Sequence, residues 1–210
     1  MKTIINNPKI KQVTDNAFTK LMDENDFNNF RFNKNVDEKI IIKDITIDSC
    51  IFEKIDFSNI ELIDIDLIDV IFDGCDLSNK CFDNKLLKRV IFNNCKMLNT
   101  SFVGASLKDV QFNNSNAKYL NFSNSKINNA SFKDSNLAES SFMEVDIKNI
   151  LLDNVNLSKA EFIKTNLSGI DFSASDITGT IFDLYSLKGI IVDGVQCQNL
   201  VGMLGVQVKD

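Results

Sequence analysis

The sequence predicts an all-β solenoid, a rod of about eight stacked square coils with a small cap at each end. Three observations lead to this fold class. An apolar residue recurs at every fifth position over most of the chain. The chain has only 8 Gly and 1 Pro, too few for the turns of a hairpin-based β protein. The remaining positions are rich in Asn, Asp, Ser and Lys, which suit frequent polar corners.

The composition already excludes several function classes. The chain has 210 residues, of which 44% are hydrophobic and 25% charged, as in an ordered globular protein. It contains no His, which removes Ser-His-Asp and Cys-His catalysis and zinc-finger sites. The net charge is −6, so we expect no direct binding of nucleic acid. We expect no catalytic residue, cofactor or metal.

The N-terminus and the cysteines indicate the compartment. Residues 1–6 lack a signal-peptide core, and no apolar stretch reaches the length of a membrane span. The 5 Cys are odd in number and form no CxxC pair. We expect a cytoplasmic protein that does not contact membranes, with Cys75 and Cys95 stacked one coil apart and reduced.

The five-residue repeat is continuous from Ile42 to Val192. Each residue whose number ends in 2 or 7 is apolar over this range, for 31 consecutive positions. Most residues two positions earlier are small or aliphatic, such as Cys50, Ala105 and Ser115. A period of five fits neither an α-helix nor a flat strand, but it fits a coil in which each pentapeptide forms one side.

The apolar residues at every fifth position fall into four columns when they are grouped at intervals of twenty residues. This grouping supports four sides for each coil. Two columns are rich in Phe, one from Phe82 to Phe182 and the other from Phe52 to Phe172. The other two columns hold mainly Leu and Ile. Phe on two opposite sides fills a square interior evenly, so we expect a packed core with stacked rings and no channel.

The pattern resembles that of the pentapeptide-repeat family, whose consensus is approximately Ala-(Asp/Asn)-Leu-x-x. Matching pentapeptides begin at Ser135, Val155 and Thr165. The resemblance covers about residues 40 to 194 and implies a right-handed quadrilateral β-helix. We expect this β-helix at 27–194, an N-terminal cap at 1–26 with a short helix near 15–22, and a C-terminal segment at 195–210.

The C-terminal segment leaves two interpretations open. Its apolar run could form a short helix and a strand-like tail that cap the monomer, or it could join two copies, as in other members of the family. We expect a homodimer, with these interface candidates: Leu200, Val201, Met203, Leu204 and Val206.

Lys80 and Lys85 occupy positions that are small or apolar in other repeats. Because a buried unpaired ammonium is costly, we expect a local bulge that brings both lysines to water. The alternative is a contact site, since Lys88 and Arg89 complete a basic cluster.

An acidic collar lies near the N-terminal end of the predicted rod. Eight acidic residues and one basic residue fall between Glu53 and Asp76. Asp69, Arg89 and Asp109 share one corner of successive coils, which predicts a surface ion-pair ladder of about 0–1 kcal/mol per pair. The carboxylates of the collar are either solvated surface groups without a binding role or a partner-binding site. Its partner-binding candidates are Glu61, Asp64, Asp66, Asp69, Asp73 and Asp76.

Within the family, the layout resembles the Qnr and MfpA group. That resemblance implies binding of DNA gyrase and topoisomerase IV, protection from quinolone antibiotics, and mimicry of DNA by an acidic rod. The chain departs from the group because it has no inserted loops and because its acidity is confined to the collar. Two hypotheses follow: a Qnr-like topoisomerase-binding protein with weak DNA-mimic character, and an interaction scaffold or self-associating protein without topoisomerase activity.

Overall fold

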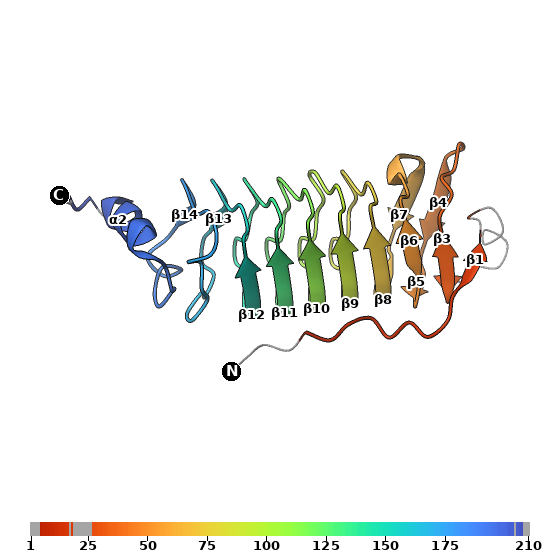
Figure 1. Cartoon of the computed structure of the whole chain (residues 1–210), viewed down its shortest axis with the longest axis horizontal. Coiled ribbons are helices and arrows are strands. Elements are labelled where there is room, and N and C mark those ends of the chain that lie inside the picture. The colour runs from red at the N-terminus through yellow and green to blue at the C-terminus, as the bar shows by residue number, and fades with distance from the viewer. Residues whose placement is uncertain (1–4, 17, 19–26, 204, 208–210) are drawn as a thin grey trace.

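The computed structural model shows the chain as a rod built from stacked coils (Figure 1). It describes residues 5–16, 18, 27–203 and 205–207. The rod is a parallel β-solenoid of about eight turns with a short helix at its C-terminal end, which confirms the predicted fold class.

Parallel strands form the walls of the rod, and each strand pairs with the next coil. The long strands have eight residues and repeat every twenty, so that Phe72, Phe92, Phe112 and Phe132 are paired in register. Isolated bridges such as Asp76↔Lys96 continue the pairing where no strand is assigned. The strands are β1 (Thr14–Asn16), β2 (Phe27–Asn28), β3 (Phe30–Phe32), β4 (Ile40–Lys43), β5 (Thr46–Asp48), β6 (Ile51–Glu53), β7 (Ile60–Ile63), β8 (Asp66–Asp73), β9 (Leu86–Asn93), β10 (Ser106–Asn113), β11 (Lys126–Lys133), β12 (Asp146–Asp153), β13 (Glu161–Phe162) and β14 (Ile181–Phe182), with a 3-10 turn at Phe57–Asn59.

Two columns of phenylalanine rings fill the interior, as predicted. Within a column the rings stack, for example Phe112 on Phe132 with centroids 4.7 Å apart. Rings from the two columns meet edge to face, as Phe112 and Phe122 do at 6.1 Å. Both geometries are favoured for aromatic pairs, so the centre of the rod is a packed core.

The corners are residues in the left-handed backbone region. Non-Gly residues whose numbers end in 4 or 9 recur with φ between +48° and +65°, and most of them are Asn or Asp, which tolerate this conformation. Ser shares the turns as expected: Ser49 has positive φ, and Ser78, Ser123 and Ser158 directly precede the positive-φ residue. Lys, Arg, Glu and Tyr also occupy corners, as at Lys54 and Tyr119.

Serine also lies at the small inward position, where its hydroxyl joins two coils. Ser115 Oγ accepts a hydrogen bond from the Cys95 amide at 3.0 Å and lies 3.3 Å from the Phe92 carbonyl oxygen. Since this hydroxyl is buried and paired, a polar side chain is tolerated inside the rod.

The N-terminal end differs from a simple cap. Thr14–Asn16 form β1, which pairs with β3 at a spacing of sixteen residues. The expected helix near 15–22 falls largely outside the described residues. Phe18 is described, and it stacks on Phe32 at 4.5 Å and covers the end of one Phe column.

Residues 5–13, which we call the N-terminal strap, leave this end and run back along the rod past β8, β9 and β10 (Figure 1). The Lys9 amide donates to Asp69 in β8 at 2.7 Å, and the Asn6 side chain donates to Asp109 in β10 at 3.0 Å. The strap therefore crosses the coils instead of adding to them.

The C-terminal end carries helix α2 (Gly194–Met203), the short helix expected from the apolar run. Asp193 and Gln196 exchange hydrogen bonds in a capping box that fixes the start of the helix. The Gln196 side chain also donates to the carbonyl oxygens of Phe172 and Ser175, at 3.0 and 2.7 Å. In this way α2 satisfies backbone acceptors that the end of the solenoid leaves open. Across the part of the chain that the structure describes, no helix has the length and apolarity needed to cross a bilayer.

Candidate interaction surfaces

The six acidic candidates form a ring around one coil. Glu61 belongs to β7, three others lie along β8, and Asp64 and Asp76 flank that strand. Because one coil takes twenty residues to go round the rod, carboxylates spread over residues 61 to 76 face different sides. The collar is therefore not one acidic patch.

Bases on the neighbouring coils offset much of the collar's charge. Glu61 pairs with Lys39 at 2.8 Å, Asp64 with Lys85 at 2.5 Å and Asp76 with Lys96 at 2.9 Å. Asp69 pairs with Arg89. Asp73 and Asp66 accept hydrogen bonds from Asn94 Nδ2 and from the Leu86 amide.

The pKa values follow these contacts. The hydrogen bond from Lys39 lowers the pKa of Glu61, and the hydrogen bond to Asp64 raises the pKa of Lys85. Burial alone would raise the pKa of Asp69, but hydrogen bonds from Arg89 and the Lys9 amide outweigh it and lower that pKa. The six carboxylates are thus already engaged within the chain.

The corner shared by Asp69, Arg89 and Asp109 is covered, and the expectation of a surface ladder is wrong. Asp69 and Asp109 are only 6% and 2% exposed, because the N-terminal strap lies over them. Asp69 pairs with Arg89, whereas Asp109 accepts from Asn6 and Asn129. The strap, which has no repeat, was not predicted from the sequence.

The coil at Lys80 and Lys85 departs locally from the regular ladder. The Lys80 ammonium donates to the carbonyl oxygen of Ile60 at 2.8 Å, and the Leu86 amide bonds the Asp66 side chain. In the next coil, a backbone amide donates to the equivalent carbonyl oxygen: the Ser101 amide bonds the Lys80 carbonyl. Both lysines are half-buried, and burial lowers the pKa of Lys80. The ladder is irregular here, but both ammonium groups bond to the neighbouring coil, so the structure does not show the expected bulge that brings the lysines to water.

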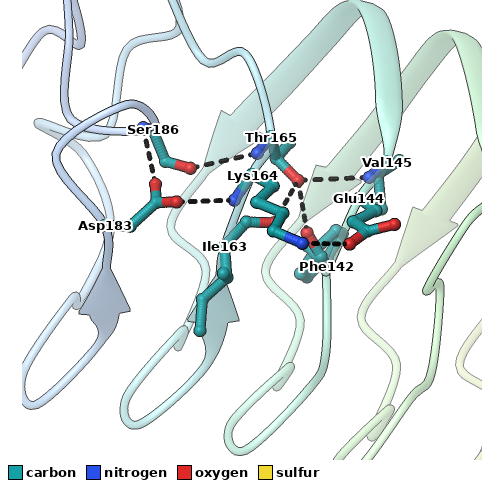
Figure 2. Close-up of polar contacts among 8 residues, drawn as sticks. All are labelled: Phe142, Glu144, Val145, Ile163, Lys164, Thr165, Asp183 and Ser186. Carbon is teal, nitrogen blue, oxygen red and sulfur yellow. Dashed lines mark hydrogen bonds and ion pairs between the residues drawn. The ribbon is translucent and has the colours of Figure 1, made fainter.

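The last full coil contains a second irregularity that the repeat did not reveal (Figure 2). The Thr165 amide donates to Ser186 Oγ at 3.0 Å, a separation of 21 residues where earlier coils show 20. Ser186 is fully buried, so it takes the inward position that the period assigns to Tyr185. Asp183 stabilises the slip by accepting hydrogen bonds from the Lys164 and Ser186 amides at 3.0 and 2.8 Å.

This slip turns Tyr185 outward, at an end of the rod where other large apolar side chains are also exposed. Leu184 is 75% exposed and Tyr185 60%, and Val195 on α2 is 69% exposed. Ile181 and Ile191 of the same end are also exposed. Several exposed apolar side chains at one end of a rod form a candidate interface.

The predicted dimer-interface residues lie beside this group. Leu200 and Val201 on α2 are half-buried, and Leu200 packs against the core of its own chain. Met203 ends α2, Val206 is 52% exposed, and Leu204 lies outside the described residues. Leu184, Tyr185 and Val195 extend the candidate interface beyond the sequence prediction. One signal was available, because a Tyr is too large for an inward position that mostly holds a small or aliphatic residue.

Comparison with protein families places the chain in a class. The model of the pentapeptide repeat region matches residues 40–122, 65–142 and 85–162. These matches together run over more than half of the chain, so the chain belongs to the pentapeptide-repeat family.

Solved structures of the family resemble the chain at low identity. Full-length QnrB1, a plasmid-mediated fluoroquinolone resistance protein, is 20% identical over 85% of this chain and 89% of its own, with a TM-score of 0.47. HetL from the cyanobacterium Nostoc sp. strain PCC 7120, involved in heterocyst differentiation regulation, is 16% identical over 82% of this chain and 93% of its own, with a TM-score of 0.29. No curated protein sequence matches the chain at a significant level.

Proposed function

We propose that the chain is a non-catalytic binding protein that works as a homodimer joined at its C-terminal ends. The observation that carries this proposal is the outward turn of Leu184 and Tyr185 at the last full coil. These side chains lie at the same end of the rod as Val195 on α2, whereas the charged collar lies toward the other end. A contact through this end is isologous, so each exposed side chain is used twice and the two rods extend away from each other.

A double substitution of Leu184→Ser with Tyr185→Ser tests the dimer. Analytical ultracentrifugation of the full chain should show a dimer for the wild type and a monomer for the variant. Leu151→Ser is the matched control, because Leu151 is 42% exposed in β12, on the wall of the rod, and should leave the dimer intact. A monomeric wild type at all concentrations tested contradicts the proposal.

A second candidate function is Qnr-like binding and protection of DNA gyrase or topoisomerase IV in the cytoplasm. Its support is membership of the pentapeptide-repeat family together with the acidic collar. The engagement of these carboxylates by Lys39, Lys85, Arg89 and Lys96 limits the resemblance to DNA, so we propose only weak DNA-mimic character.

Gyrase supercoiling, measured with and without a fluoroquinolone, tests this second candidate. The purified chain should change supercoiling or restore it in the presence of the drug. A variant with Glu61→Gln and Asp64→Asn should lose the effect if the collar carries it. A chain without effect in either assay leaves the homodimeric binding protein with another partner.

A further inference from the structure

The N-terminal strap lies on the rod as an extended ligand lies on its receptor. Its described residues alternate in exposure, with Ile5, Pro8, Ile10 and Val13 half-buried and the polar residues between them exposed. The strap runs across three successive coils and forms no ladder with them, since its contacts in β8 and β10 are made to side chains.

Two carboxylates hold the strap at a spacing that matches its backbone. Asp69 and Asp109 occupy the same corner two coils apart, or about 9.6 Å. The strap amides that face them belong to Lys9 and Asn6, three residues apart, which is about 9 Å in an extended Pro-containing segment. Asp69 accepts from Lys9 N at 2.7 Å, and Asp109 accepts from Asn6 N at 3.4 Å and Nδ2 at 3.0 Å.

A third contact comes from the same face of the rod. Gln111 Nε2, two residues after Asp109, donates to the Asn7 side chain at 2.8 Å. The rod thus offers acceptors for backbone amides and a donor for a side-chain carbonyl, in the way that peptide-binding surfaces read an extended segment.

The solenoid does not need the strap for its own hydrogen bonding. The strand pairs that join β8, β9 and β10, such as Phe72↔Phe92 and Phe92↔Phe112, involve no strap residue. By contrast, the strap provides hydrogen-bond donors to two carboxylates that are only 6% and 2% exposed. Removal of the strap would take away the donors that Lys9 and Asn6 provide to Asp69 and Asp109.

We infer that this face is a binding track for an extended peptide, and that the strap fills it as a tethered ligand in the free protein. The partner it fits is a protein segment of the same chemistry. Such a segment has two backbone amides, three residues apart, that are free to donate, and a Pro lies between them. The first of these two residues is an Asn, and the apolar side chains of the segment face the rod. Binding of that segment displaces the strap.

The hold of Asp109 on the strap is tested in the full chain by amide hydrogen exchange. Asp109→Asn places an amide donor among the donors of Asn6 and Asn129, so the Asn6 amide should exchange at least about tenfold faster. Asp134→Asn is the matched control. Asp134 is also a positive-φ corner that accepts from an Asn twenty residues later, but it is exposed and outside the strap. It should leave exchange of the Asn6 amide unchanged.

The track itself is tested with a fluorescein-labelled peptide of residues 5–13. The full chain carrying Asn6→Ala and Lys9→Pro has a weakened strap and an unaltered rod, and it should bind the peptide saturably. A peptide with the same two changes should not bind, and Asp109→Asn added to the chain should weaken binding at least about tenfold.

Three results overturn the inference: equal exchange of the Asn6 amide in the Asp109→Asn and wild-type chains, no saturable binding up to about 1 mM peptide, and equal binding of the wild-type and altered peptides. The dimer is measured separately by ultracentrifugation, so failure of the track and failure of the proposed dimer are distinguishable.

Discussion

Thr165 provides the sharpest test of how the coils are held together at the C-terminal end. Its hydroxyl donates to the Phe142 carbonyl oxygen at 2.6 Å and accepts from the Val145 amide at 3.1 Å (Figure 2). Thr165 is fully buried and Val145 is 3% exposed, so water does not replace these bonds. Thr165→Val keeps the shape of the side chain and removes only the hydroxyl.

The expected cost follows from the groups left without a partner. A buried amide without its acceptor costs about 1–3 kcal/mol, so we expect Thr165→Val to lower the free energy of unfolding by about 2 kcal/mol. Thr165→Ser keeps the hydroxyl and loses one methyl group, for about 1 kcal/mol. For a chain of this size, 2 kcal/mol corresponds to a fall in Tm of about 4–8 °C.

Thermal and urea unfolding followed by far-UV circular dichroism measure both variants. The reasoning requires that Thr165→Val be the less stable of the two. If Thr165→Ser is the more destabilised variant, the methyl group and not the hydroxyl joins these coils, and the account of the network is refuted.

Three further predictions concern the collar, the cap and the thiols. The pKa of Asp69 is lowered in the folded chain, so its contribution to stability is complete above the pKa of the unfolded chain. That contribution is lost as the pH falls through the pKa of the folded chain. The urea midpoint should therefore fall less steeply from neutral to acid pH for Asp69→Asn than for the wild type. Gln196→Ala removes the capping box and two bonds to the last coil, and should cost about 2 kcal/mol in urea unfolding; an unchanged midpoint contradicts the role of α2 as a cap. A thiol reagent should modify the exposed Cys81 and Cys197 at once and the three buried thiols only after unfolding, and rapid modification of a third thiol in the folded chain contradicts the packing.

The walls and interior of the rod were predictable because they follow one short period. Each apolar residue at every fifth position enters the same environment, so Phe92 and Phe112 could be placed in one stack from their numbers alone. Pairing between coils then follows from the side-chain columns, since a shift of register would place polar residues inside.

The strap and the slip at Ser186 were not predictable in the same way. Asn6 meets a residue 103 positions away through an isolated side-chain contact, and no repeat marks such a pair. At Tyr185 the five-residue repeat of the sequence continues, but the backbone is shifted by one residue. The small Ser186 side chain fits the inward position and the phenol ring of Tyr185 does not. Both features bear on the candidate interaction surfaces, where local contacts override the repeat.

The difference between the five-residue repeat and the twenty-residue coil restricts how such a rod can change length. Duplication or loss of twenty residues between Phe72 and Phe132 would keep every column aligned and only move the C-terminal end along the axis. Duplication of a single pentapeptide would turn all later coils by a quarter of a circle. Phe would then enter columns now filled by Leu and Ile, and Tyr185 would point to another side relative to the strap. Evolution of a rod like this one is therefore expected to proceed in whole coils, with its two ends held at a constant angle to each other.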